Sequence, residues 1–173
     1  MRIISGKLKG KPISFLKSST TRPLKDSVKE NIFNILDHSH LLGIKIKNKN
    51  ILDLYSGYGS FGLECISRNA DKVTFVEKNK NVINILNKNL VNLSVLDKAI
   101  IVNEEIENFL KQKQSKKFDI IFLDPPFAEN NYIKELDLIW KKKIYRKNHI
   151  IIIHRENNSL DDYKKIVNPL IIK

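Results

Sequence analysis

The tetrapeptide Asp124-Pro125-Pro126-Phe127, which follows directly on an apolar run, carries residue types that can do chemistry. Its two prolines fix the backbone φ angle and remove two N–H donors. The Asp124 carboxylate and the Pro125 carbonyl then remain as acceptors, with the Phe127 ring beside them for stacking. Such a group suits the exocyclic amine of a nucleobase, which becomes nucleophilic only when acceptors bind its hydrogens. A proline turn with Asp124 capping a following helix is the purely structural alternative.

A second set of residues has the spacing of a nucleotide-binding turn. Gly57, Gly59 and Gly62 form a G-x-G-x-x-G pattern after another apolar run, and glycine lets the backbone turn tightly and approach a ligand closely. Glu77 closes the next apolar run, twenty residues after Gly57, where a carboxylate can accept hydrogen bonds from ribose hydroxyls. Together they predict a nucleoside cofactor, whereas the glycines alone are also compatible with a structural turn.

Alternating strands and helices are predicted around both segments. Apolar runs predict five strands, at Ile51–Tyr55, Lys72–Glu77, Ala99–Val102, Phe118–Leu123 and His149–His154. Helices are predicted after the glycine turn and at Asn81–Leu93, Glu104–Gln112 and Tyr132–Lys141. This alternation predicts a doubly wound α/β fold with a mostly parallel sheet covered on both faces. Ligands bind beyond the carboxyl ends of such strands, and Gly57, Glu77, Glu105 and Asp124 all fall at this edge.

The 173 residues are predicted to form a single domain, because no long linker, repeat or low-complexity tract divides them. Residues 1–23 form a basic N-terminal extension and loop, in which residues 2–15 are predicted to make a short β-hairpin that presents charge away from the core. Residues 24–173 comprise a helix, with apolar residues from Val28 to Leu36 at helical spacing, and the α/β core.

The chain is strongly basic, with a formal net charge of +12, which favours a polyanionic partner. Lys outnumbers Arg 26 to 5, so overall basicity also fits a drift in composition. Its distribution is more informative: residues 1–29 hold eight basic residues and one acidic residue, a net charge of +7. This block is typical of a nucleic-acid contact, with a solvated surface as the alternative.

The sequence gives no support for a disulfide-stabilised, metal-binding or membrane-spanning protein. Cys65 is the single cysteine, so no internal disulfide can form, and its place in a predicted helix favours a buried thiol. The four histidines (His38, His40, His149 and His154) show no metal-ligand spacing, and no metal is assigned. Trp140 is interpreted as a core anchor. The N-terminus lacks an apolar signal core and no stretch is long enough to span a membrane, so we expect a soluble, cytoplasmic protein.

The tetrapeptide and the glycine turn together resemble class I S-adenosylmethionine-dependent methyltransferases that act on exocyclic amino nitrogens. Further motifs narrow the resemblance. Arg2-Ile3-Ile4-Ser5-Gly6, Arg22-Pro23, Glu30-x-x-Phe33-Asn34-x-Leu36 and Leu63-Glu64-x-x-Ser67-Arg68 occur in that order. They are similar to motifs of the RsmD family of bacterial 16S rRNA guanine-N2 methyltransferases, and the likeness runs from residue 2 to about residue 156.

The resemblance implies S-adenosylmethionine as methyl donor and a guanine of 16S rRNA, within the small ribosomal subunit or its assembly intermediate, as acceptor. Asp53 and the glycine turn would hold the methionine end. The turn residues are Tyr55, Ser56, Gly57, Gly59 and Gly62. Glu77 would bind the ribose, with Lys78, Glu105 and Ile106 around the adenine. Asp124, Pro125, Pro126 and Phe127 would hold the target base. Phosphate contacts are expected from Arg2, Lys7, Lys9, Lys11 and Arg22, in a protein that acts as a monomer.

The sequence departs from the family pattern at four places. Leu24 stands where Thr is usual, Tyr58 replaces a small residue, and Glu105 replaces a shorter Asp or Asn. The chain stops at Lys173, after a predicted strand at Leu170–Ile172, so that the family's last, antiparallel strand is missing from the expected fold.

Three other functions share part of this pattern. An N6-adenine methyltransferase acting on DNA or RNA would use the same acceptor geometry. A nicotinamide-dependent oxidoreductase would need only the glycine turn and Glu77. A non-enzymatic RNA-binding module would need only the basic N-terminus.

Overall fold

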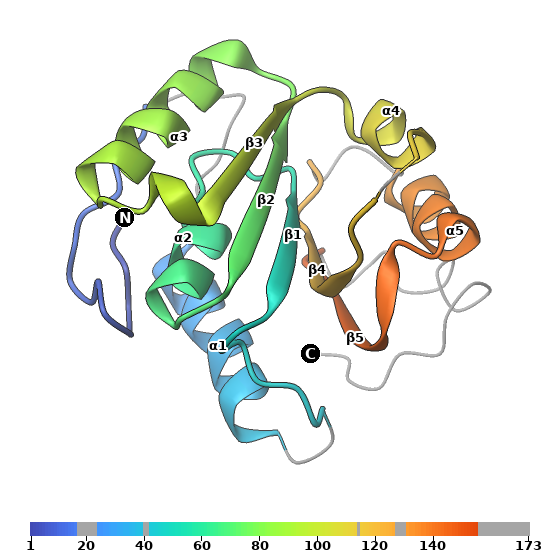
Figure 1. Ribbon diagram of the computed structural model, residues 1–173. Helices are drawn as coiled ribbons and strands as arrows, with labels where there is room; N and C mark the ends of the chain where they lie inside the picture. Colours follow the sequence, from blue (N-terminus) through green and yellow to red (C-terminus); the bar gives the residue numbers. More distant parts are fainter. Residues whose placement is uncertain (17–23, 40–41, 114, 127–130, 156–173) are drawn as a thin grey trace.

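The computed structural model describes residues 1–16, 24–39, 42–113, 115–126 and 131–155. Within these residues the centre of the fold is a parallel sheet with the strand order β3-β2-β1-β4-β5 (Figure 1). The strands are β1 (Asn50–Leu54), β2 (Lys72–Glu77), β3 (Ala99–Asn103), β4 (Phe118–Leu123) and β5 (Tyr145–Ile153). The prediction of a doubly wound, mostly parallel α/β fold is therefore confirmed.

β1 lies in the middle of the sheet and pairs with β2 on one side and with β4 on the other. Its residues Ile51, Leu52 and Leu54 are fully buried, as a strand covered on both faces requires. Because the strand order reverses at β1, the ends of β1 and its neighbours open into a crevice, where such sheets bind ligands.

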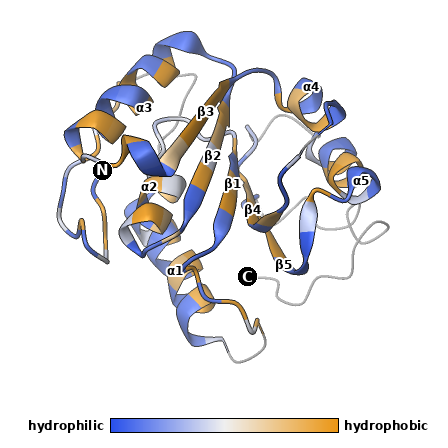
Figure 2. Cartoon of the chain, viewed as in Figure 1, coloured by the Kyte–Doolittle hydropathy of each residue, from blue (hydrophilic) through white to orange (hydrophobic). Residues whose placement is uncertain are grey.

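Helices cover the two faces of the sheet (Figure 1). One face carries α1 (Asp26–His38), α2 (Ser60–Ser67) and α3 (Lys80–Asn92), and the other carries α4 (Ile106–Lys111) and α5 (Tyr132–Lys142). A short 3₁₀ turn, Leu96–Lys98, precedes β3. The hydropathy colouring shows the apolar residues of the helices and strands between these layers (Figure 2). No helix of the described residues is long and apolar enough to cross a membrane.

The core is divided by the sheet into two hydrophobic clusters. On the α1–α3 face, three aromatic rings connect helix to sheet: Phe33 stacks on Phe61 with centroids 5.2 Å apart, and Phe61 stacks on Phe122 at 4.0 Å. The guanidinium of Arg68 lies 4.5 Å from the Phe33 ring centroid. On the other face, α4 and α5 contribute Ile106, Phe109, Leu110 and Ile139. This packing fixes α1 and α2 beside the carboxyl ends of the strands.

The N-terminal segment folds back on itself and is held against the core. Arg2 and Pro12 form one antiparallel bridge, and Ile3 and Ile13 are buried with the α1–α3 cluster. The buried carboxylate of Glu64 in α2 accepts the backbone N–H groups of Ile4 and Ser5 at 2.7 and 2.9 Å. The backbone of this segment is thus held against the core, while its basic side chains Arg2, Lys7, Lys9 and Lys11 are exposed, as expected for a segment that presents charge away from the core.

Two expectations are corrected. Trp140 is not a core anchor, since 49% of its surface is exposed. The fifth strand begins at Tyr145 rather than His149, because a polar first half still pairs with β4, from Phe118 opposite Tyr145 onward. Figure 2 shows this strand changing from hydrophilic to hydrophobic along its length. Arg22, Phe127 and the predicted strand Leu170–Ile172 lie outside the described residues.

Candidate active site

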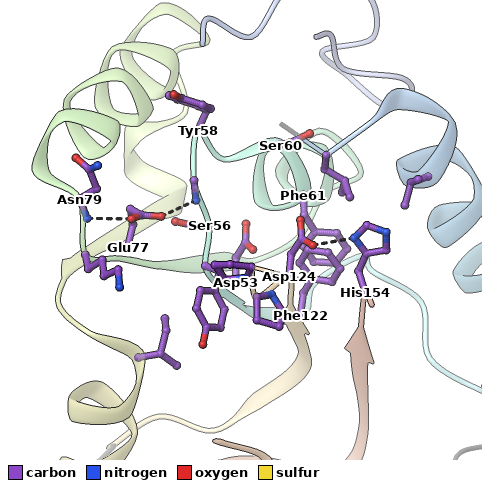
Figure 3. A pocket seen from close by; sticks show the side chains of 18 of the residues that line it. Asp53, Ser56, Tyr58, Ser60, Phe61, Glu77, Asn79, Phe122, Asp124 and His154 are labelled. Atoms are coloured by element: carbon purple, nitrogen blue, oxygen red, sulfur yellow. Dashed lines mark hydrogen bonds and ion pairs between the residues drawn. The ribbon is translucent and has the colours of Figure 1, made fainter. Parts of the chain in front are cut away.

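A cavity of about 680 Å³ opens at the carboxyl ends of β1, β2 and β4 (Figure 3). Most of the residues singled out in the sequence line it: Asp53, Tyr55, Ser56, Gly57, Glu77, Lys78, Glu105, Ile106, Asp124, Pro125 and Pro126. The fold therefore brings the glycine turn, the acidic strand end and the proline segment to one cavity, as the parallel topology predicts.

The glycine turn adopts backbone conformations that glycine allows. After β1 the chain passes through positive φ at Tyr55 (60°), Gly57 (53°) and Gly59 (88°). A Cβ on Gly59 would lie 2.5 Å from Leu86, and a Cβ on Gly62 would lie 2.2 Å from Phe75. Neither Gly59 nor Gly62 lines the cavity. These two glycines shape the turn and pack α2 against β2 and α3, whereas Gly57 borders the cavity itself.

Asp53 lies at the end of β1 on the cavity wall, with 1% of its surface exposed. Its Oδ2 accepts the N–H of Gly62 at 2.9 Å, which ties β1 to the first turn of α2. Burial raises the pKa of Asp53 well above its ordinary value, and the nearby charges of Asp124 and Glu77 raise it further. An uncompensated carboxylate in this position favours a cationic ligand group.

Glu77 bridges two loops at the carboxyl end of β2. Its Oε2 accepts the N–H of Gly57 at 3.1 Å, and its Oε1 accepts the N–H of Asn79 at 2.9 Å. Figure 3 shows both contacts along the cavity. Each carboxylate oxygen can accept a second hydrogen bond, so the geometry leaves capacity for two ribose hydroxyls. Asn79 was missed in the sequence; it caps α3 through its Oδ1, which accepts the N–H of Asn81 at 3.0 Å.

The rim beyond Glu77 is formed by Lys78 and Glu105, whose side chains form an ion pair at 3.5 Å. Both side chains are more than half exposed, at 56% and 59%. Ile106 behind them is buried and lines the cavity. The longer Glu105 thus reaches Lys78 across the rim, while the apolar face for a flat ring is supplied by Ile106.

The Asp124-Pro125-Pro126 segment is held by the two residues that follow β5. The Nδ1 of His154 lies 2.7 Å from the Oδ1 of Asp124, and the Nη1 of Arg155 donates to the Pro126 carbonyl at 2.8 Å. The backbone N–H of His154 donates to the Leu123 carbonyl at 2.9 Å. His154 also lines the cavity and was missed, because the sequence placed it only at a strand end, with no spacing to suggest a partner.

The wall opposite the cofactor residues comes from the N-terminal segment and α1. Met1, Leu24, Lys25 and Val28 line this part of the cavity. Behind them, the fully buried Lys29 donates to the Arg2 carbonyl at 2.5 Å and lies 3.4 Å from Asp26. Burial lowers the pKa of Lys29. This wall was also missed, although Leu24 had been noted as a departure from the family pattern.

Tyr58, the other departure in the turn, joins the N-terminal segment to the glycine turn. It is 3% exposed and lines the cavity. Its hydroxyl donates to the Leu16 carbonyl at 3.4 Å, and its carbonyl accepts the amide of Asn89 at 3.2 Å. The basic side chains predicted to contact RNA, Arg2, Lys7, Lys9 and Lys11, are exposed on this same segment and do not line the cavity.

The residues present fit a nucleoside cofactor. The Ser56 hydroxyl is buried at the cavity without a hydrogen-bond partner among the described residues, so a ligand there can satisfy it. The backbone at Gly57 carries no side chain that would exclude a ligand. Among the described residues no cluster of His, Cys, Asp and Glu could hold a metal ion.

Comparison with known proteins agrees with this geometry. The family described as "Conserved hypothetical protein 95" matches residues 1–168. Ribosomal RNA small subunit methyltransferase D of Haemophilus influenzae is 37% identical over 98% of this chain and 83% of its own length. The protein of the same name from Buchnera aphidicola subsp. Acyrthosiphon pisum is 36% identical over 89% of this chain and 77% of its own.

Solved structures show the same fold. The Escherichia coli protein yhhF superposes with a TM-score of 0.70 and 30% identity, over 87% of this chain and 74% of that chain. A Haemophilus influenzae structure has a TM-score of 0.66 and 35% identity, over 83% of this chain and 84% of that chain. The family match and these relatives extend over nearly the whole chain. The chain therefore belongs to the conserved hypothetical protein 95 family, the RsmD family of methyltransferases.

Proposed function

We propose that this protein transfers a methyl group from S-adenosylmethionine to the exocyclic N2 of one guanine in 16S rRNA of the small ribosomal subunit. Family membership and the names of the relatives from Haemophilus influenzae and Buchnera aphidicola support small-subunit rRNA as the substrate. Guanine N2 is proposed from the acceptor geometry together with the resemblance of the motifs to RsmD proteins. In this proposal residues 1–173 act as one domain, as a monomer in the cytoplasm.

The cofactor half of the cavity suits a nucleoside joined to an amino acid. S-adenosylmethionine, when bound, supplies an electrophilic methyl group on a sulfonium. Asp53 would pair with the ammonium of the methionine end, beside the Ser56 hydroxyl and the Gly57 backbone. Glu77 would accept the ribose hydroxyls, and Ile106 would contact the adenine, with Lys78 and Glu105 at the rim. These residues lie along one continuous cavity wall.

The acceptor half positions an amine beside the methyl group. Asp124 Oδ1 is engaged by His154, which leaves Oδ2 to accept a hydrogen from the guanine amine, while the Pro125 carbonyl accepts the other. Both acceptors draw the lone pair of the amine out of conjugation, so that it can form the new N–C bond as the S–C bond breaks. The amine proton then passes to Asp124 or to solvent. Phe127 remains the proposed stacking residue for the base.

The observation that carries this proposal is the juxtaposition of two carboxylates with different tasks in one cavity. Glu77 is anchored by backbone N–H groups at the end of β2. Asp124 lies two strands away from Glu77, at the end of β4, and its carboxylate is held by the imidazole of His154. A nicotinamide-dependent oxidoreductase would use the first and would leave the proline segment without a role.

The experiment incubates the protein with methyl-labelled S-adenosylmethionine and one of three acceptors: small subunits lacking the modification, free 16S rRNA, or DNA. The product is digested to nucleosides. The expected result is N2-methylguanosine from small subunits, and about a hundredfold less with the Asp124→Ala variant, which removes the acceptor. Labelled N6-methyladenine, from RNA or DNA, would instead assign the adenine alternative. No transfer to any acceptor by protein that binds the cofactor would refute the proposal.

A further inference from the structure

A second concave surface lies at the opposite edge of the sheet, at the amino ends of β1, β4 and β5. It encloses about 790 Å³, and five cationic side chains line it: Lys49, Lys116, Lys117, Arg146 and Lys147. Among the residues that the structure describes, Asp119 is the single acidic residue of this surface. Five cations against one carboxylate leave a local charge of +4. Such a concavity concentrates positive potential and attracts a polyanion.

Asp119 organises this surface rather than neutralising it. The carboxylate is 4% exposed, and its Oδ2 accepts the N–H of Asn50 at 2.9 Å. It also lies 3.5 Å from Lys49 Nζ and 3.5 Å from Arg146 Nε. The Arg146 side chain is nonetheless 54% exposed. One buried carboxylate thus holds two cations at the surface, where a phosphate can receive further hydrogen bonds from the guanidinium.

An aromatic stack that includes the exposed Trp140 contains Tyr145, the residue that directly precedes Arg146 in β5. Trp140 stacks on Tyr145 with ring centroids 5.2 Å apart, and Tyr145 stacks on His149 at 4.2 Å. Trp140 is 49% exposed, and the stack connects the end of α5 to the polar first half of β5. An exposed ring beside cations is the combination that binds single-stranded nucleic acid, with bases on the ring and phosphates on the charges.

We propose that this edge binds RNA, with phosphates on the five cations and a base stacked on Trp140. β4 has six residues and a strand rises roughly 3.3 Å per residue, so this edge lies roughly 20 Å from the active-site cavity. It is therefore a second contact for RNA that flanks the target base. The choice of RNA as the polyanion rests on the proposed function.

Composition alone does not account for this surface. A drift toward lysine explains scattered lysines, but it does not explain why Arg146, one of only five arginines, lies on this surface directly after Tyr145, which stacks on the single tryptophan of the chain. The buried Asp119 is also a specific arrangement, since an unpaired carboxylate would be costly there.

The first test compares Lys117→Ala/Lys147→Ala with a control pair, Lys88→Ala/Lys98→Ala, which removes the same charge from α3 and the 3₁₀ turn before β3. Binding of a 16S rRNA fragment is measured directly over a range of salt concentrations. The Lys117/Lys147 pair should weaken binding several-fold and lower the log–log salt slope by about 1.4, and the control pair should change neither. Equal losses of RNA affinity in the two double variants would mean that binding depends only on the net charge of the protein, and would overturn the proposal.

The second test uses Trp140→Ala and Trp140→Phe. Loss of the ring should weaken RNA binding about tenfold without changing the salt slope, and phenylalanine should restore most of it. Polyphosphate binding should fall with the lysine pair and stay constant with Trp140→Ala. If the Trp140→Ala variant bound RNA as tightly as the wild type, the surface would be a site for polyanions in general, and the RNA assignment would be overturned. Cofactor affinity should be unchanged throughout, and because binding is measured without turnover, a failure of the proposed methyl transfer is seen separately.

Discussion

The Oδ1 of Asp124 lies 2.7 Å from the Nδ1 of His154, across the carboxyl ends of β4 and β5. The contact joins residues 30 positions apart in the chain, and both border the active-site cavity. It engages one oxygen of a carboxylate that borders the cavity and thereby restricts the rotation of the group. Two predictions follow from this pair, one for each member.

Asp124→Ala should separate chemistry from binding. In the proposed mechanism the carboxylate acts mainly in the transition state, where it would accept a hydrogen from the amine. Methyl transfer should therefore fall by about a hundredfold or more, while cofactor affinity stays within a few-fold. Single-turnover kinetics and calorimetry measure the two quantities. Near-normal turnover on small subunits would show that the proline segment is a structural turn.

His154 is expected to act through Asp124, as a positioning residue. His154→Ala should lower kcat about tenfold, in the range of a lost hydrogen bond to a charged group, with little change in KM or cofactor affinity. His154→Gln retains an N–H donor and should recover part of kcat. Equal kcat values for the Ala and Gln variants, together with a lower melting temperature, would assign His154 a structural role only.

Much of the site could be predicted because its signals are local. The apolar run of β4 ends directly at Asp124, and the glycine spacing and Glu77 each belong to one strand and its turn. A parallel sheet then brings strand ends together whatever the details of packing. The positions of the glycine turn and Glu77 at the cavity therefore follow from periodicity and spacing, whereas Asp53, Lys78 and Ile106 are expected there only from the resemblance to RsmD proteins.

The missed residues depend on packing between distant elements. His154 meets Asp124 only because β5 pairs with β4 in one register, and Val28 and Met1 reach the cavity because Glu64 and Lys29 hold the N-terminal segment. Trp140 follows the buried Ile139 by one residue, about 100° around the helix. An apolar residue at that angle faces the core only if another element covers it.

Glu77→Ala should weaken S-adenosylmethionine binding several-fold or more. The substitution removes the acceptors proposed for the ribose hydroxyls and also frees the N–H groups of Gly57 and Asn79, which hold the turn in place. Calorimetry measures the loss, and Glu104→Ala, a change at another cavity-lining carboxylate, serves as the control. Binding of NAD with no response to S-adenosylmethionine in the wild-type protein would contradict the cofactor assignment.

Replacement of Lys7, Lys9 and Lys11 by alanine should weaken RNA binding and lower its log–log salt slope by about 2, if each lysine contacts one phosphate. All three side chains are exposed on the docked N-terminal segment, so the fold should be retained, which circular dichroism can check. A slope equal to that of the wild type would assign these lysines to composition rather than to RNA contact.

The raised pKa of Asp53 predicts a pH-dependent stability of the ligand-free protein. Burial disfavours the charged form, so the folded-state pKa lies above the unfolded one. The folded protein then binds the extra proton, and stability falls as pH rises from the unfolded pKa of Asp53 through its folded pKa. Asp53→Asn keeps an acceptor for the Gly62 N–H and cannot ionise. Its free energy of unfolding, relative to wild type, should therefore increase from acidic to neutral pH in urea titrations.

The control is Asp71→Asn, at an exposed carboxylate, which should follow the wild-type pH profile. Saturation with S-adenosylmethionine should remove much of the fall in the wild-type free energy of unfolding between acidic and neutral pH. The proposed reason is that the ammonium of the ligand compensates the Asp53 charge. A constant stability difference between Asp53→Asn and wild type across this range would mean that burial does not raise the folded-state pKa of Asp53 above its unfolded value, and the predicted pH dependence would be wrong.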